Sequence, residues 1–98
     1  MIVLKKRLNE NTTLTLVDNS LEGLQEAVGG YIETVTLASD AVAIYDEEAR
    51  LKGKPYCCSI SNIDFYGTIL VAGVKGEDFE SLSAKAGTAV RERIKVKR

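Results

Sequence analysis

The uncharged run FYGTILVAGV, residues 65–74, constrains the fold of this chain more than any other segment. Ten residues without a charge need burial on both faces, which is typical of a central strand in a sheet. The run is far shorter than the roughly 20 apolar residues of a membrane-spanning helix, so no membrane partner is expected. Gly67 and Gly73 within it indicate a bulge or the close approach of another backbone segment.

Short segments rich in β-branched residues surround this run. Residues 2–7 and 12–17 predict two strands, and residues 31–37 and 41–46 predict two more, with turn-forming residues between the members of each pair. Residues 52–56 contain a glycine and a proline, which favours an irregular or edge segment.

Two amphipathic segments predict helices. Asn19 is the expected N-cap of the first, Glu22 would complete a capping box, and Gly29 is the expected stop. The second helix is expected from Glu77 onward, where apolar residues recur at spacings of three and four and acidic residues would complement the helix dipole. The apolar residues are Phe79, Leu82, Ala86, Val90 and Ile94.

This order of elements predicts an α+β fold. We expect a small antiparallel sheet of about five strands, with one helix after the first strands and one C-terminal helix packed on it. The 98 residues fit a single domain, residues 1–98, with a compact part at about 1–90 and a basic tail at 91–98. Because a core of this size is small, a homo-oligomer is expected.

Charge is unevenly distributed along the chain. The net charge of −1 argues against nucleic acid as the partner, since such binders are usually basic. Residues 91–98 carry +4, so the remaining ninety carry −5. The tail is expected to contact phosphate, an acidic partner or the acidic body of another protomer, or else to favour a helix C-terminus. Its basic residues are Arg91, Arg93, Lys95, Lys97 and Arg98.

Reactive side chains are few. The chain has no histidine, which excludes Ser–His–Asp and Cys–His catalysis within one chain. The two cysteines, Cys57 and Cys58, are neighbours, so they cannot form a disulfide framework and fit a zinc site badly. We therefore expect no enzymatic activity, no catalytic residues, no metal and no cofactor. The absence of a signal-peptide pattern favours a cytoplasmic protein.

Three features have two interpretations each. Cys57 and Cys58 are either structural thiols, one of them buried because neighbours on a strand point to opposite faces, or a redox pair. The acidic residues 46–48 form either a solvated turn or a Ca²⁺ or Mg²⁺ site. Gly76 belongs either to a turn or to an anion site before a helix.

Three segments carry a resemblance to a known family. They are LEGLQEAVGGYIETVTL (residues 21–37), AVAIYDEEARLKGKP (41–55) and GTILVAGVKGEDFESL (67–82). Together they resemble a domain family of unknown function from bacteriophages and mobile elements of Gram-positive bacteria. Typical members have a VGGYIE segment, an EEGKLxGLPxNR segment, a GTxxIVG segment and an EDFxSL segment.

The chain departs from this pattern after the proline, where the family's asparagine–arginine pair is replaced by Cys57 and Cys58. The resemblance implies a setting, a small accessory protein of a mobile element in the bacterial cytoplasm. It brings no catalytic residues, and an activity that depends on the asparagine–arginine pair would be lost here.

Two binding functions fit these observations, with an enzyme third. The leading hypothesis is a non-enzymatic protein that binds and modulates a host protein, such as a component of host defence. The alternative is a small-ligand binder that sequesters a nucleotide or a similar anion. The residues expected to line a ligand or partner site are Tyr31, Tyr45, Arg50, Lys54 and Tyr56.

Overall fold

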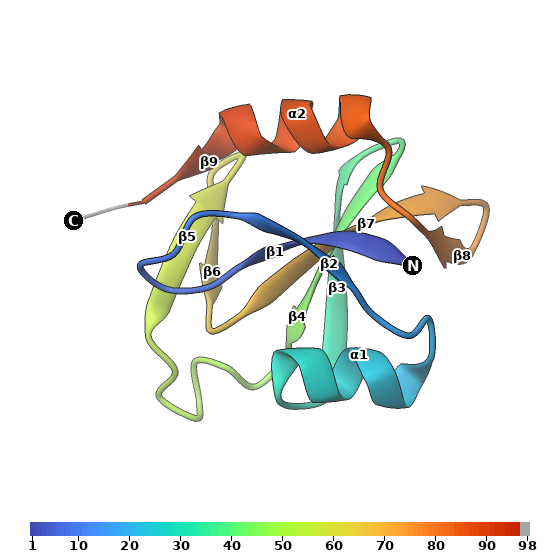
Figure 1. Ribbon diagram of the computed structural model, residues 1–98. Coiled ribbons are helices and arrows are strands. Elements are labelled where there is room, and N and C mark those ends of the chain that lie inside the picture. The colour runs from blue at the N-terminus through green and yellow to red at the C-terminus, as the bar shows by residue number, and fades with distance from the viewer. Residues whose placement is uncertain (97–98) are drawn as a thin grey trace.

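The computed structural model describes residues 1–96 and places strand β7 (Ile69–Lys75) at the centre of its larger antiparallel sheet (Figure 1). The first five residues of β7 are buried, as its apolar sequence requires. The strand order is β2 (Thr13–Leu16), β1 (Ile2–Lys6), β7, β4 (Ala41–Asp46) and β3 (Ile32–Ala38), with β8 (Asp78–Glu80) paired to the end of β7.

A smaller sheet stands beside the larger one and holds the end of the described chain. Its order is β6 (Ile63–Tyr66), β5 (Tyr56–Ile60) and β9 (Ile94–Lys95). The α+β class, the antiparallel pairing and the two helices are confirmed. The strands outnumber the five expected because residues 56–60, 63–66, 78–80 and 94–95 also form paired strands.

Two helices cover opposite sides of the larger sheet. Helix α1 (Leu21–Val28) lies below it in Figure 1, and α2 (Ala84–Arg93) lies above. Each packs on its own core because side chains alternate between the faces of a strand. On β1, for example, Val3 joins the core under α1, whereas Leu4 joins the core under α2.

The N-cap of α1 is Ser20, so the prediction of Asn19 was wrong by one residue. The backbone at Ser20 is extended, and its Oγ accepts a hydrogen bond from the Gly23 N–H at 3.0 Å. Asn19 instead donates from Nδ2 to the Phe79 carbonyl at 2.9 Å. Gly29 ends the helix in the left-handed conformation, with φ of 81°, as predicted.

The run at residues 65–74 is not one strand. Gly67 has φ of 74° and turns the chain, so Phe65 belongs to β6 and Ile69 begins β7 in the other sheet. The close approach predicted at Gly73 is confirmed, since a Cβ there would lie 2.6 Å from the Ser81 carbonyl oxygen.

The second helix begins at Ala84, so the prediction of a start at Glu77 was wrong. Residues 78–80 form β8, which folds back on β7 through a turn at Gly76, where φ is 63°. The anion site considered before a helix at Gly76 is therefore excluded, because no helix starts there. Ser83 caps α2 by accepting a hydrogen bond from the Ala86 N–H at 3.1 Å.

The segment expected to be a basic tail is part of the fold as far as it is described. Arg91 and Arg93 lie in the last turn of α2, and Arg93 donates from Nη1 to the Leu37 carbonyl at 3.1 Å. Lys95 lies in β9 opposite Ser59. Lys97 and Arg98 lie outside the described residues. Within residues 1–96, no helix is long and apolar enough to cross a membrane.

Two glycines provide a matched test of this packing. Gly73→Ala places its methyl group against backbone and should lower the free energy of unfolding by roughly 1–3 kcal/mol. Gly87→Ala in α2 meets only Leu82 Cδ2 at 3.5 Å and should raise it by roughly 0.5–1 kcal/mol. Urea unfolding followed by circular dichroism measures both. Equal stability of the two variants would contradict the close approach at Gly73.

Candidate functional site

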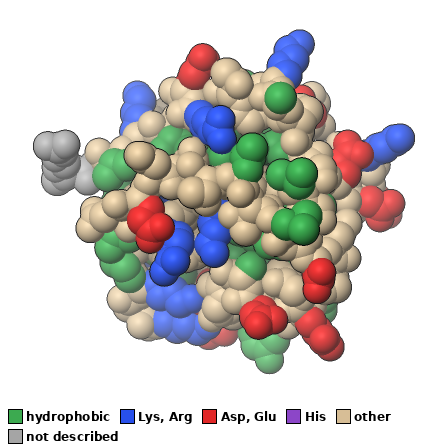
Figure 2. Space-filling model, in the orientation of Figure 1, with side chains coloured by type: hydrophobic (Ala, Val, Ile, Leu, Met, Phe, Trp, Pro, Cys, Tyr) green, Lys and Arg blue, Asp and Glu red, His purple; other side chains and the backbone are tan. Residues whose placement is uncertain are grey.

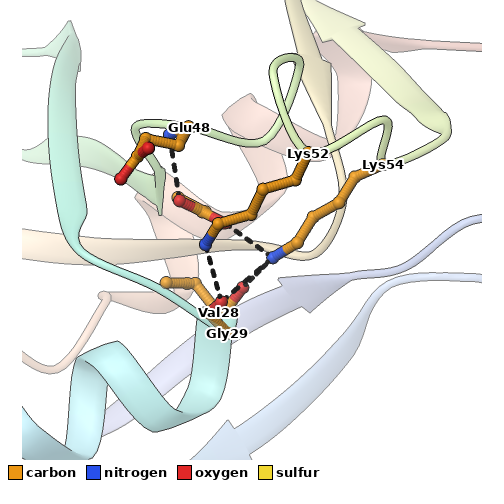
Figure 3. A network of polar contacts seen from close by, with 6 residues as sticks. Val28, Gly29, Glu48, Lys52 and Lys54 are labelled. Carbon is orange, nitrogen blue, oxygen red and sulfur yellow. Dashed lines mark hydrogen bonds and ion pairs between the residues drawn. The ribbon is translucent and has the colours of Figure 1, made fainter.

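Asp46, the last residue of β4, is the centre of the densest polar network in the described chain. Its side chain is 1% exposed and its Oδ2 accepts from Lys52 Nζ at 2.8 Å and from Lys54 Nζ at 2.7 Å. Its Oδ1 accepts from the Glu48 backbone N–H at 2.9 Å. Figure 3 shows Lys52 and Lys54 extending from their loop into the network that the dashed lines mark.

The same two lysines also reach the C-terminal end of α1. Lys54 Nζ donates to the Val28 carbonyl at 3.0 Å, and Lys52 Nζ contacts the Gly29 carbonyl at 3.3 Å (Figure 3). Helix C-termini leave carbonyl groups unpaired and carry partial negative charge, so both ammonium groups are stabilised there. The VGGYIE and LKGKP segments, distant in sequence, are thereby joined.

Gly30 is required at this junction. A Cβ on Gly30 would lie 2.5 Å from Lys52 Nζ and 2.6 Å from Asp46 Oδ1. Any larger residue would push apart the ion pair that closes the loop. The second glycine of the VGGYIE segment therefore makes room for the network, whereas the first ends the helix.

The electrostatics of the network keep Asp46 ionised. Burial alone would raise the pKa of the Asp46 carboxyl, but hydrogen bonds from Lys52, Lys54 and the Glu48 N–H lower it to about 2. The hydrogen bond to Asp46 raises the pKa of Lys52. Because the lysines and a backbone N–H already occupy both carboxylate oxygens, the network holds the loop in place. No group of three or more acidic or cysteine side chains in the described chain is arranged to hold a metal ion.

Arg50 and Tyr56, two of the five residues predicted to line a site, meet around a residue that was not predicted. Arg50 Cζ lies 4.9 Å from the ring centre of Tyr66, and the Tyr56 ring meets the Tyr66 ring edge to face at 5.5 Å. These three residues form a cluster of aromatic and cationic groups beside the smaller sheet.

Tyr66 was missed because the hairpin of β5 and β6 was missed. Ser61 and Asn62 both have positive φ, 51° and 67°, as in the two-residue turns that join antiparallel strands. A polar Ser-Asn pair between two apolar segments was the available signal. It would have placed the start of β5 beside Tyr66, and the register shift between Tyr56 and Cys58 then brings Tyr56 opposite Tyr66.

The other predicted residues lie apart from this cluster. Lys54 belongs to the Asp46 network and lines a hollow of about 280 Å³. Tyr45 packs edge to face on Phe65 at 5.3 Å, and burial, followed by the charge of Glu33, raises its pKa. Tyr31 is exposed, and its carbonyl accepts a hydrogen bond from the Glu47 N–H.

Cys57 and Cys58 are both fully buried, so the prediction that only one would be buried was wrong. The register of β5 shifts between Tyr56 and Cys58, and both thiols join the core under α2. Cys57 Sγ contacts the Lys6 carbonyl oxygen at 3.7 Å. The contact with Cys57 and burial raise the pKa of the Cys58 thiol.

An exposed apolar surface, not predicted from the sequence, lies on the edge strand β2. Leu16 opposes Ile2 and Leu14 opposes Leu4, so these side chains share the face that α2 covers further along. Ile2, Leu14 and Leu16 are 46%, 63% and 78% exposed, and we call these three residues the β2 face. Figure 2 shows hydrophobic side chains grouped on the side of the molecule where β1 and β2 lie in front.

A family model described as a domain of unknown function (DUF3846) matches residues 1–95. No curated protein and no solved structure matches the chain.

The Asp46 network predicts a specific dependence of stability on pH. The folded-state pKa of about 2 lies below the ordinary value of 3.8, so ionised Asp46 stabilises the fold above about pH 4. This contribution is lost as the pH falls toward 2. Asp46→Asn should lower the free energy of unfolding by roughly 1.5–3 kcal/mol at pH 7, with a smaller difference from wild type at pH 2.5.

The control is Glu47→Gln, the same change of charge at an exposed neighbour, with an expected effect under about 0.5 kcal/mol. Denaturant unfolding at the two pH values measures all three proteins. An Asp46→Asn variant as stable as wild type at pH 7 would show that the network does not hold the loop.

Proposed function

The chain belongs to the DUF3846 family, and we propose that it is a non-enzymatic protein that binds and modulates a host protein through the β2 face. Its proposed setting is a phage or mobile element acting in the bacterial cytoplasm, where a component of host defence is one such target. The observation that carries the proposal is the exposure of Ile2, Leu14 and Leu16 together on an edge strand.

Edge strands are usually protected, because their free backbone groups can pair with any extended segment. Charged side chains, proline and bulges are the common means of protection. Strand β2 has none of them, since its sequence TLTL carries no charge and pairs with β1 in regular register. Two leucines face solvent beside a free edge, which favours binding of a partner by strand addition.

The surrounding surface favours a protein as the partner. Threonine hydroxyls alternate with the leucines along β2, and the Thr13 and Thr15 side chains lie 3.3 Å apart on the other face. Strand β2 thus offers a partner backbone hydrogen-bonding groups at its edge, leucine side chains on one face and threonine hydroxyls on the other. These are the elements of a protein interface with an apolar centre and a polar rim.

A second copy of the chain is the other possible occupant of this surface. The homo-oligomer was expected because the core is small, and the uncharged run at residues 65–74 offers it no free edge, since β7 has β1 and β4 on its two sides. Self-association through β2 remains compatible with the uncharged sequence of that strand. Light scattering on the purified protein at micromolar concentration distinguishes it from binding of a different protein.

The test is a paired capture experiment with the tagged protein and bacterial host lysate. A Leu14→Lys, Leu16→Lys double variant should retain its fold, because both side chains are already largely exposed. It should bind the captured partner at least about 100-fold more weakly, since each buried leucine contributes roughly 1.5–3 kcal/mol. Mass spectrometry identifies the partner, and calorimetry with the purified partner measures the affinity.

Leu51→Lys is the matched control. Leu51 is 86% exposed and lies in the loop that precedes β5, away from β2. The Leu51→Lys variant should bind the captured partner as tightly as the wild type does. Equal capture by the double variant and the wild type would exclude the β2 face as the binding surface, and a monomer that captures nothing would refute the proposal as a whole.

A further inference from the structure

A second feature of the α2 side is a hollow of about 780 Å³ at the opposite end of β1 from Ile2. It lies between the turn that joins β1 to β2 and the end of α2 with the residues that follow. The residues that line it are Lys6, Asn9, Glu10, Asn11, Thr12, Arg91, Ile94 and Val96. Its volume falls in the range of small-molecule sites in proteins, roughly 300–1,000 Å³.

Lys6 is the unusual residue of this hollow. It is only 6% exposed, and its ammonium group donates one hydrogen bond, to the Arg7 carbonyl at 2.7 Å. None of the carboxylates in residues 1–96 forms an ion pair with it. Buried lysines are normally paired, and an ammonium group has three N–H donors, so two of them have no acceptor within residues 1–96.

The neighbours of Lys6 add to the positive potential. Arg91 lines the hollow from α2, and the side chains of Asn9, Asn11 and Thr12 bring polar groups from the turn. Glu10, the one acidic residue among the described lining residues, is exposed, and its Oε2 lies 3.5 Å from Arg7 Nε. An anion in the hollow would therefore face two cations and one carboxylate that is already partly neutralised.

Part of the lining of the hollow is apolar. Ile94 and Val96 supply it from the residues that follow α2, and no aromatic residue of the described chain belongs to the lining. The lining thus combines cationic and aliphatic side chains. A fully inorganic anion would use only the first of these, whereas an anion with an organic group would use both. The hollow is therefore not expected to distinguish one nucleobase from another by stacking on an aromatic side chain.

We propose that this hollow binds a small phosphate monoester. Its phosphate group lies against Lys6 and Arg91, and its organic part lies against Ile94 and Val96. A lysine provides a point charge and an arginine a planar pair of donors, and the two together suit a phosphate. The site is separate from the β2 face, so it is independent of the function proposed above.

The experiment is a calorimetric titration of the whole protein with adenosine monophosphate, inorganic phosphate and adenosine, at constant ionic strength set with sodium chloride. Adenosine monophosphate is the expected best ligand, inorganic phosphate a weaker one, and adenosine should not bind measurably. Amide chemical shifts in an NMR titration should change at Asn9, Asn11 and Arg91. Equal binding of adenosine and its phosphate, or no binding of either phosphate, would overturn the proposal.

Three variants locate the site. Lys6→Met and Arg91→Gln should each weaken binding of adenosine monophosphate by at least about tenfold, because each removes a charge-assisted hydrogen bond. Lys85→Gln, an exposed basic residue of the same helix that does not line the hollow, should leave binding unchanged. Because Arg91 is exposed, its variant retains the fold even if Lys6→Met does not. Equal binding by Arg91→Gln and wild type would place the ligand elsewhere and refute the assignment.

Discussion

One buried carboxylate fixes how the two halves of this chain meet. Asp46 ends a strand of the larger sheet, and the lysines that neutralise it also bind the carbonyls at the end of α1. The loop from β4 to β5 is thereby held against the first helix, and the smaller sheet begins where that loop ends. Removing any one partner would leave the others partly unsatisfied, so strand end, helix end and loop depend on each other.

Alternation along β1 explains why both proposed surfaces lie on the same side of the molecule. Ile2, Leu4 and Lys6 point to one face because successive strand residues alternate. Helix α2 has ten residues, roughly 15 Å in length, and its apolar side chains pack with Leu4. Ile2 is left exposed beside β2 at one end, and Lys6 lines the hollow at the other. One face of β1 thus contributes to an apolar surface at one end and to a cationic hollow at the other.

The sequence was informative where local chemistry decides the structure, and less so where distant partners decide it. The first four strands and the end of α1 at Gly29 followed from β-branched residues and a glycine stop. The start of α2 did not, because Phe79 fits a helical spacing equally well but pairs in β8 opposite Val74. Arg50 and Lys54 were selected for their chemistry, yet their partners Tyr66 and Val28 lie in other elements. Lys6 resembles a surface residue in sequence, yet the fold leaves it only 6% exposed.

The pairing of β1 with β7 affects how the protein is made. Leu4 lies opposite Val71 in the larger sheet, and Ile94 pairs with Ile60 in the smaller one. Both sheets therefore join segments that are far apart in sequence. A ribosome that has produced only the first half of the chain has released β1 through β4 without the strand that lies between β1 and β4. The apolar residues of those strands stay exposed until the second half of the chain is synthesised. Chaperones bind such exposed segments during synthesis. The molecule is therefore expected to acquire its sheet only near the end of translation.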